Sequence, residues 1–418
     1  MKRILVYADW FKGKPPIAMG TLSAAPSRGQ EVFFFQYSEE WLKSDFCGIL
    51  DPELQFFTGS QYLQDSNKNN FGLFLDSSPD RWGRLLMRRK EAVAARLENR
   101  AERRLQESDY LLGVYDPQRM GGLRFKLDAG EPFLNYDSQL SVPPWSSLRE
   151  LEYASMQIEK GEALNDTEYL KWLTMLISPG SSLGGARPKA GVIDTDNNLW
   201  IAKFPSCNDK KDTGAWEIVV NNLAKDAGLK TAEGMIRKFS GRHHTFLTRR
   251  FDRDCNGKRI HFASAMTMLG YTDGDNADTG ASYLDIVEFI LQHGCRADKD
   301  LEELWRRIIF YIAVSNTDDH LRNHGFLLTD EGWTLSPAFD INPVEYGTGL
   351  SLNISENDNS LDFSLARSVA GYFRIPGKKA EEIISQVIES VSHWREYADK
   401  YNIPVSEQNI MAKAFRVK

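Results

Sequence analysis

The sequence predicts an α+β fold, with a β-rich N-terminal part and a mainly helical C-terminal part. Short apolar runs close to the N-terminus have the length and composition of buried strands. They occupy residues 4–7, 17–22 and 31–37. After residue 262, apolar residues recur instead at the three- and four-residue spacing of amphipathic helices. Such helices are expected over residues 281–293, 301–315 and 380–401.

The length of the chain predicts more than one structural part. Its 418 residues exceed what a single compact core usually holds. A stretch rich in glycine and proline, residues 128–146, is the best candidate for a linker. We therefore expect an N-terminal subdomain, a middle part with further strands, and the helical C-terminal part. Their predicted bounds are 1–146, 147–262 and 263–418.

Composition and charge disfavour several classes of protein. A formal net charge of −7 does not favour direct binding of nucleic acid, and the arginine-rich segment 81–104 is interpreted as a solvated helix face. The four cysteines are widely spaced and form no CxxC pair, which indicates free thiols in a reducing cytoplasm rather than a zinc site or a disulfide framework. No run of about 18 apolar residues is present, so we expect no membrane span.

The middle part is expected to alternate helices with a strand hairpin. The capping-box pair Asn165 and Glu168 begins a helix that ends at residues 178–180. The hairpin and the following helix are expected over residues 190–193, 199–204 and 213–227. Between the first helix and the hairpin lies the glycine-rich segment GSSLGGARPK, residues 180–189.

Three features of the middle part are candidates for phosphate binding. Glycines let backbone N–H groups approach phosphate oxygens, but residues 180–189 lack the GxxxxGK[ST] pattern and by themselves indicate only a loop. Lys203 lies in an apolar strand, where it either holds phosphate or reaches solvent from a sheet edge. Glu217, on the next helix, either pairs with Lys203 or lies on the surface.

A polar loop after the helix 301–315 carries the sharpest signal. Asp318 and Asn323 are five positions apart, which matches the carboxylate and the amide of the protein-kinase catalytic loop. Asp340, next to Phe339, resembles the metal-binding aspartate of the DFG motif but lacks its glycine. Taken alone, the Asp318 loop is better interpreted as a cap and turn, and Asp340 is equally compatible with an exposed turn.

The order of the five features decides between these alternatives. A glycine-rich loop, a strand lysine, a helix glutamate, an Asp-x-x-x-x-Asn loop and a later aspartate follow one another in protein kinases. Chance readily supplies one such feature, but not all five in the right kinds of element. The sequence therefore predicts a protein-kinase-like fold. We expect a β-rich N-terminal lobe with an extra N-terminal subdomain, and a mainly α-helical C-terminal lobe.

The chain also resembles a known family, the HipA-like serine/threonine kinases of bacterial type II toxin–antitoxin systems. The resemblance covers nearly the whole chain. It rests on Asp-Ser-Ser-Pro-Asp-Arg-Trp-Gly (76–83), DYLLGV (109–114), RMGGLRF (119–125), NTDDHLRN (316–323) and Phe339-Asp340.

The resemblance implies ATP and Mg²⁺ as cofactors and a role for each matching residue. Asp318 is similar to the catalytic carboxylate, and Asn323 and Asp340 are similar to the Mg²⁺ ligands. Ser182 aligns with a serine whose autophosphorylation ejects the glycine-rich loop and shuts off the kinase, with Ser181 as a competing candidate. The residues implied to contact ATP are Leu183, Gly184, Gly185, Ala186, Arg187, Lys189, Lys203, Arg249, Phe251, His320, Asn323 and Asp340.

Two positions depart from the family pattern. The loop reads GGARPK where the best-known member has a Gln-Glu pair before the lysine, and Arg249 stands at a hinge position that can be acidic. Both departures affect residues expected to contact the nucleotide.

The resemblance further implies a cytoplasmic protein with a protein substrate and a HipB-like antitoxin. DNA would be bound only through the antitoxin, and no membrane is involved. Two rival hypotheses remain open, namely a small-molecule kinase on the same fold and a non-catalytic pseudokinase that acts with its antitoxin.

Overall fold

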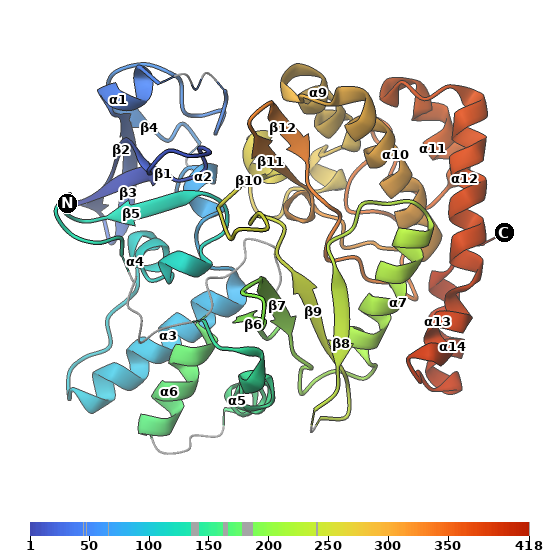
Figure 1. Ribbon diagram of the computed structural model, residues 1–418, viewed down its shortest axis with the longest axis horizontal. Coiled ribbons are helices and arrows are strands. Elements are labelled where there is room, and N and C mark those ends of the chain that lie inside the picture. Colours follow the sequence, from blue (N-terminus) through green and yellow to red (C-terminus); the bar gives the residue numbers. More distant parts are fainter. Residues whose placement is uncertain are drawn as a thin grey trace. The chain divides into compact units, whose positions relative to one another are not determined.

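Contacts within the chain divide it into two compact units (Figure 1). Unit 1 comprises Met1–Cys207, Asp252–Ala263 and Leu328–Asp330, and unit 2 comprises Asn208–Phe251, Ser264–Leu327 and Glu331–Lys418. The computed structural model describes all residues except 45, 47, 66, 135–141, 162–165, 178–186, 240 and 418. The predicted α+β class is confirmed, while the three-part division stays a prediction.

Unit 1 is built on a five-stranded antiparallel sheet with the order β4-β3-β2-β1-β5. Its strands are β1 (Lys2–Ala8), β2 (Ile17–Ser27), β3 (Gln30–Tyr37), β4 (Gln61–Tyr62) and β5 (Leu123–Lys126). The three strands expected near the N-terminus are confirmed, and Phe33 and Phe35 of β3 are fully buried. β2 continues past its expected end at residue 22, because pairing with β3 holds the small residues that follow.

Helices pack together in unit 1. The described helices are α1 (Glu39–Leu42), α2 (Gly72–Leu75), α3 (Arg81–Leu97), α4 (Glu107–Leu112), α5 (Leu148–Lys160) and α6 (Asp166–Leu176). α6 packs on α3 and α5, and its residues Tyr169, Leu173 and Leu176 are buried. The expected capping residue Asn165 and the expected helix end at 178–180 lie outside the described residues. β6 (Lys189–Ile193) and β7 (Leu199–Lys203) form the expected antiparallel hairpin.

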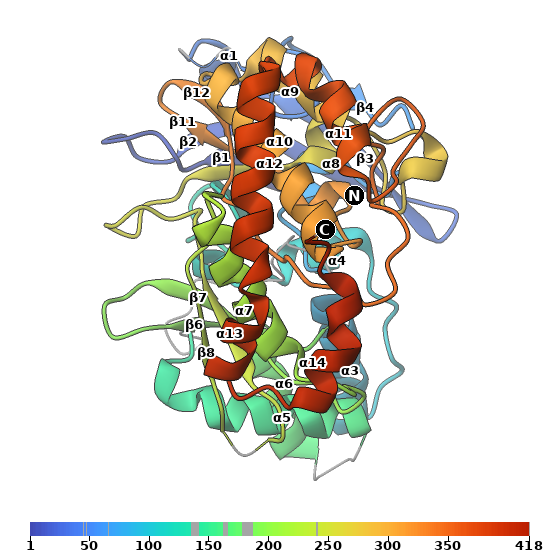
Figure 2. The ribbon, with the colours of Figure 1, turned by 90° about the vertical axis from the view of Figure 1, so that its right-hand side faces the viewer.

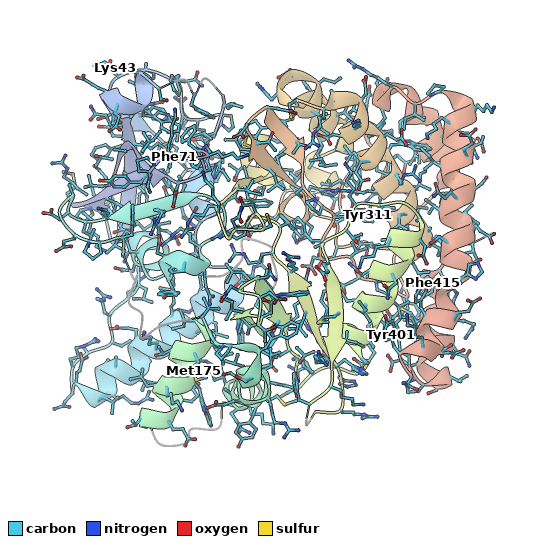
Figure 3. The ribbon with its side chains drawn as sticks, in the orientation of Figure 1. Lys43, Phe71, Met175, Tyr311, Tyr401 and Phe415 are labelled. Carbon is cyan, nitrogen blue, oxygen red and sulfur yellow. The ribbon has the colours of Figure 1, made fainter. Side chains whose placement is uncertain are left out.

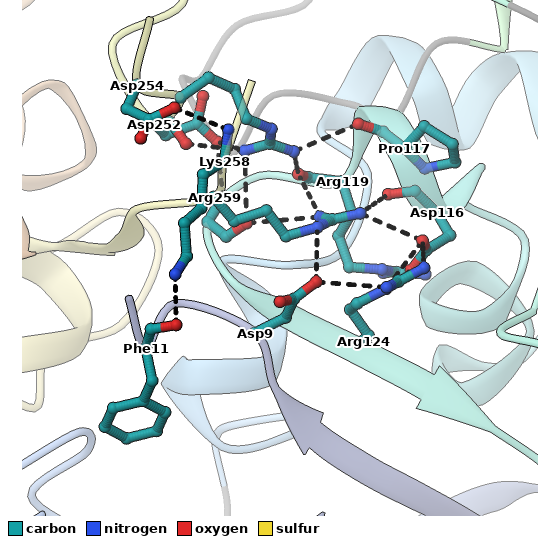
Figure 4. A network of polar contacts seen from close by, with 12 residues as sticks. Asp9, Phe11, Asp116, Pro117, Arg119, Arg124, Asp252, Asp254, Lys258 and Arg259 are labelled. Carbon is teal, nitrogen blue, oxygen red and sulfur yellow. Dashed lines mark hydrogen bonds and ion pairs between the residues drawn. The ribbon is translucent and has the colours of Figure 1, made fainter. Parts of the chain in front are cut away.

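A buried polar network lies within unit 1, and Figure 4 shows it. Asp116 accepts hydrogen bonds from Nη2 of Arg124 at 2.7 Å and from Nη2 of Arg259 at 3.1 Å. Arg253 donates to the backbone oxygen of Arg119 at 2.8 Å. Arg119 and Arg124 belong to the RMGGLRF segment, so this segment has a structural role: it ties the chain around Arg253 and Arg259 to the N-terminal sheet.

In unit 2, α7 (Thr213–Asp226) packs on a strand hairpin and on two C-terminal helices (Figure 1). The hairpin pairs β8 (Gly234–Arg237) with β9 (Thr245–Arg249). The helices are α12 (Gly377–Ser392) and α13 (Trp394–Lys400). Gly228 follows the end of α7 with φ of 80°, a left-handed backbone that glycine adopts without strain. The helix expected over residues 213–227 is therefore confirmed.

The C-terminal part is mainly helical, with one correction. α9 (Tyr283–His293) and α10 (Ala297–Val314) confirm two expected helices, and α8 (Ala265–Met268), α11 (Phe363–Val369) and α14 (Val405–Met411) are further ones. The single helix expected over 380–401 is wrong, because the chain breaks at His393 between α12 and α13 (Figure 2). Directly after the break, Trp394 stacks on Phe415, which Figure 3 labels, with 4.5 Å between ring centroids. Apolar periodicity continues across the break and hides it in the sequence.

Three further strands had no counterpart among the expected elements. They are β10 (His261–Ser264), β11 (Gly325–Thr329) and β12 (Gly332–Leu335). Gly332, with φ of 126°, supplies the sharp reversal between β11 and β12. Within the described residues, no helix combines the length and apolar character needed to cross a membrane. Cys207, Cys255 and Cys295 are free thiols.

Candidate active site

The Asp318 loop (residues 315–324) begins where α10 ends. The apolar stripe of α10 is fully buried, which fixes the helix in the core of unit 2. Ser315 then adopts a left-handed conformation, with φ of 50° and ψ of 48°, and ends the helix. The backbone N–H of Asn316 still bonds the carbonyl of Tyr311 at 2.9 Å. A rigid helix end therefore positions the polar loop.

Asp318 and Asn323 are in direct contact within this loop. Nδ2 of Asn323 donates to the backbone oxygen of Asp318 at 2.6 Å. The Asn323 residue is only 3% exposed, whereas the Asp318 side chain is 71% exposed. Nε2 of His320 lies 3.8 Å from Oδ1 of Asp318. The five-residue spacing thus places a carboxylate toward solvent and an amide in the interior.

Asp319 anchors the Asp318 loop, a role that the sequence analysis did not assign. Its buried carboxylate accepts hydrogen bonds from the Tyr283 hydroxyl and from the backbone N–H of Ser351, the latter at 2.6 Å. Burial raises the pKa of Asp319 to about 7, although these donors oppose the rise. Nε2 of His324 lies 3.2 Å from the backbone oxygen of Asp319, and burial lowers the pKa of His324 to about 3. A neutral histidine and a buried carboxyl therefore anchor the loop on its buried side.

The Asp340 segment (residues 338–344) is fixed at its start by a parallel bridge. The Ala338 N–H bonds the Lys230 carbonyl at 2.7 Å, and the Ala232 N–H bonds the Ala338 carbonyl at 3.0 Å. Phe339 contacts Phe251, with ring centroids 5.4 Å apart. Phe251, which the resemblance implies to contact ATP, therefore touches Phe339, the neighbour of the implied Mg²⁺ ligand Asp340.

Asp340 itself has an uncommon backbone. Its φ of 55° lies in the left-handed region, which non-glycine residues occupy at a cost of about 1–3 kcal/mol. Oδ1 of Asp340 accepts a hydrogen bond from Nδ2 of Asn342 at 3.1 Å. Such strained residues gather at functional sites, where the surrounding structure holds them in place.

Hydrogen bonds join the Asp318 loop to the Asp340 segment. The backbone N–H of Asn342 donates to Oδ1 of Asn316 at 3.1 Å, and that of Val344 donates to the Ser315 carbonyl at 3.2 Å. Tyr311, labelled in Figure 3, lies on α10, and its backbone oxygen accepts from the N–H of Asn316 in the Asp318 loop. Burial chiefly raises the pKa of its hydroxyl, and the carboxylates of Asp319 and Asp340 add to the rise. The two segments expected to share a nucleotide-bound metal are thus one connected structure.

The joined segments present oxygen atoms suited to a divalent cation. Oδ1 of Asn323 is buried and accepts no hydrogen bond from the described residues, and the same holds for Oδ1 of Asn342. Mg²⁺ takes carboxylate and amide oxygens and commonly completes its shell with substrate phosphates and water. In the described part of the chain, no group of three His, Cys, Asp or Glu side chains could hold a metal. The side-chain oxygens of Asn323 and Asp340, together with a phosphate ligand, are of the kind that Mg²⁺ takes.

The lysines expected to contact ATP are both buried in unit 1. Lys189 forms an ion pair with Asp80 at 2.8 Å, and its backbone oxygen accepts from Nε1 of Trp82 at 3.1 Å. Lys203 stands opposite Lys189 in the β6–β7 register and is 8% exposed, so the alternative of a lysine reaching solvent is wrong. Glu217 in unit 2 is 4% exposed, so the alternative that it lies on the surface is also wrong.

Other expected site residues are only partly described. Arg249 pairs with Glu233 at 3.4 Å, and Arg187 is half-buried. The remaining members of the glycine-rich segment lie outside the described residues, and their roles stay predictions. They are Ser181, Ser182, Leu183, Gly184, Gly185 and Ala186.

The family of the chain follows from its match to a family model. The HipA-like C-terminal domain model matches residues 181–394, which is half of the chain and includes the Asp318 loop and Asp340. The chain belongs to the HipA-like family. A solved HipA from Shewanella oneidensis MR-1, in complex with HipB and its operator DNA, matches with a TM-score of 0.65 at 16% identity. That match covers 97% of this chain and 94% of the HipA chain, and it confirms the expected HipA-like fold.

Two curated relatives are more similar in sequence but shorter in overlap. One is named "Putative kinase", from Haemophilus influenzae, and is 28% identical over 179 residues. The other carries a similar name, from Sinorhizobium fredii, and is 27% identical over 181 residues. Each match covers 38% of this HipA-like chain, which spans only 52% and 41% of the two relatives.

Proposed function

We propose that this HipA-like chain is an ATP- and Mg²⁺-dependent serine/threonine protein kinase with Asp318 as its catalytic carboxylate. The observation that carries the proposal is the hydrogen-bonded connection of the loop that holds Asp318 and Asn323 to the segment that holds Asp340. An exposed carboxylate stands beside a buried amide whose Oδ1 accepts no hydrogen bond from the described residues. The joined segment adds a strained aspartate.

Each of the proposed site residues would have a separate role in phosphoryl transfer. ATP supplies the γ-phosphoryl group, and bound Mg²⁺ neutralises phosphate charge. Asn323 and Asp340 would hold the cation through their side-chain oxygens. Asp318, which a protein hydroxyl can reach because it is exposed, would orient that hydroxyl and accept its proton. Lys203 and Lys189 are the proposed phosphate contacts of unit 1.

We also propose an antitoxin partner and control by autophosphorylation at Ser182 or Ser181. The solved HipA with the similar fold is described in complex with HipB and its operator DNA. A HipB-like protein is therefore the proposed partner of this chain, and DNA would be bound through that partner. The net charge of −7 agrees with such indirect binding.

Transfer of label from γ-labelled ATP tests the kinase proposal. The purified chain is incubated with Mg²⁺, labelled ATP and host lysate, and phosphopeptides are identified by mass spectrometry. We expect labelled protein substrates and phosphate on Ser181 or Ser182. Asp318→Asn and Asp340→Ala should each lower transfer by about a hundredfold or more, because they remove the proton acceptor and a cation ligand.

A matched control separates lost chemistry from lost folding. Glu382 is an exposed carboxylate of α12, so Glu382→Gln changes one charge at a distant element and should leave transfer intact. Circular dichroism should show all three variants folded. Undiminished transfer by Asp318→Asn or Asp340→Ala would refute the assignment, and transfer to metabolites but not to proteins would favour a small-molecule kinase.

A further inference from the structure

A polar groove lies beside the Asp318 loop in unit 2. Its volume is about 370 Å³, and we call it the Asp278 groove. It is lined by residues 276–278, 317, 344, 346–351 and 359. Thr317, which directly precedes Asp318, belongs to the lining, so the groove opens next to the proposed catalytic carboxylate.

The walls of the Asp278 groove are fastened to the Asp318 loop. Oγ of Ser351 donates to the Thr317 carbonyl at 2.8 Å, and its N–H donates to Oδ1 of Asp319 at 2.6 Å. The Ser351 carbonyl accepts from the N–H of Ala277 at 2.7 Å, which joins the second wall. A Cβ placed on Gly347 would lie 2.5 Å from the Thr317 methyl group, so this wall packs directly on the loop. A ligand in the groove is thereby held in a fixed position relative to Asp318.

The lining of the Asp278 groove suits an extended polypeptide. Asn276, Thr317, Thr348 and Asn359 offer side-chain hydrogen-bonding groups. Small-molecule pockets are mostly apolar and bury nearly all of their ligand, whereas Asp278, Tyr346 and Thr348 at this groove are exposed. Extended peptides bind through main-chain hydrogen bonds, with side chains selected at particular positions.

Charge is distributed unevenly along the Asp278 groove. Asp278 is the only ionisable acid or base among its lining residues, apart from the Tyr346 phenol. Lys413 lies over the Tyr346 ring at 4.9 Å, and Nη2 of Arg416 donates to the Gly347 carbonyl at 3.3 Å. The groove therefore has an acidic wall at Asp278 and cations near Tyr346.

We propose that the Asp278 groove binds the acceptor-bearing segment of a protein substrate, with a lysine or arginine of that segment against Asp278. The inference rests on the proposed kinase function and adds the class of substrate that the site selects. Phosphoryl transfer forms the bond between the acceptor oxygen and the γ-phosphorus and breaks the bond to ADP. The hydroxyl proton passes to Asp318.

A library of peptides tests this inference. Each peptide contains one serine or threonine acceptor, and lysine or glutamate is placed in turn at every flanking position. The measured quantity is the ratio of initial rates for the lysine and the glutamate peptide, so a change in overall kcat cancels. At one flanking position we expect the wild-type chain to prefer lysine by about fivefold, the selectivity that one exposed ion pair provides.

Reversal of one charge should reverse the preference. Asp278→Lys should favour glutamate at that same position by about fivefold, and Asp278→Asn should bring the ratio close to one. Tyr346→Ala, in the wall formed by residues 346–351, should raise KM for all peptides and leave the charge preference in place. Glu382→Lys is the matched control, because it reverses an exposed charge that does not line the groove.

The outcomes separate the groove from the kinase proposal. The proposal that the groove binds the substrate would be overturned by an unchanged rate ratio in Asp278→Lys. It would also be overturned if the wild-type chain phosphorylated lysate proteins but selected no charge at any position. Either result would leave the kinase proposal standing. Phosphorylation of metabolites alone would overturn the groove proposal as well. Absence of any Mg²⁺- and Asp318-dependent transfer from ATP would end both proposals.

Discussion

Removal of the Asp80 carboxylate should destabilise unit 1 strongly. Asp80 accepts a hydrogen bond from the Gly83 N–H at 2.9 Å as the N-cap of α3, and it pairs with Lys189 at 2.8 Å. The Asp80 side chain is 2% exposed and that of Lys189 is 6% exposed. Asp80→Ala therefore leaves a buried ammonium without this partner.

The size of the effect follows from these two contacts. Loss of an N-cap costs about 1 kcal/mol. Loss of one partner of a buried ion pair costs about 3–5 kcal/mol, because the remaining buried charge loses that compensation. The two costs overlap, since one carboxylate makes both contacts, and we expect Asp80→Ala to lower the free energy of unfolding by about 4 kcal/mol.

Urea unfolding followed by tryptophan fluorescence measures this loss. The double variant Asp80→Ala, Lys189→Met removes both charges of the pair and should recover about 2 kcal/mol relative to Asp80→Ala alone, because the ammonium that lost its carboxylate is removed as well. A loss below about 1 kcal/mol in Asp80→Ala, or a double variant that loses the sum of the two single effects, would refute the reasoning.

Two further predictions concern buried titratable groups. Tyr283→Phe removes a donor to the buried carboxyl of Asp319, so it should lower the free energy of unfolding in urea by about 1–3 kcal/mol; an effect near zero would contradict the anchoring role. Burial lowers the pKa of His261 to about 3, so between pH 6.5 and 3 the unfolded chain binds a proton that the folded chain does not, and stability falls as the pH falls. Over the 1.5 units from pH 6.5 to 5 this loss is about 2 kcal/mol. His261→Phe should reduce the difference in urea stability between pH 7.5 and 5 by that amount, and an unchanged difference would contradict it.

Local patterns predicted those features whose cause is local. The apolar stripe of α10 and the apolar run of β3 both contain residues that a neighbouring element buries, so these patterns report the structure directly. The five-residue spacing of Asp318 and Asn323 likewise allows a hydrogen bond between these two residues within one short loop. The family resemblance then supplied roles that spacing alone could not.

The features that sequence analysis missed depend on distant partners. Asp319 is buried because Tyr283 and Ser351 supply donors from 36 and 32 residues away. Nothing in the local sequence indicated which of the two adjacent carboxylates, Asp318 or Asp319, would be exposed. The ion pair of Lys189 with Asp80 likewise joins residues far apart in the sequence. The sequence did carry a signal for the turn between β11 and β12, because Gly332 lies between two apolar runs. The helical character of the surrounding sequence outweighed this signal.

Binding of Mn²⁺ with a non-hydrolysable ATP analogue, followed by electron paramagnetic resonance, tests most directly that Asn323 and Asp340 hold one nucleotide-bound cation. We predict that Asn323→Ala and Asp340→Ala each weaken Mn²⁺ binding by about tenfold or more, while Glu382→Ala binds as the wild type does. Wild-type affinity in both Asn323→Ala and Asp340→Ala would contradict the account.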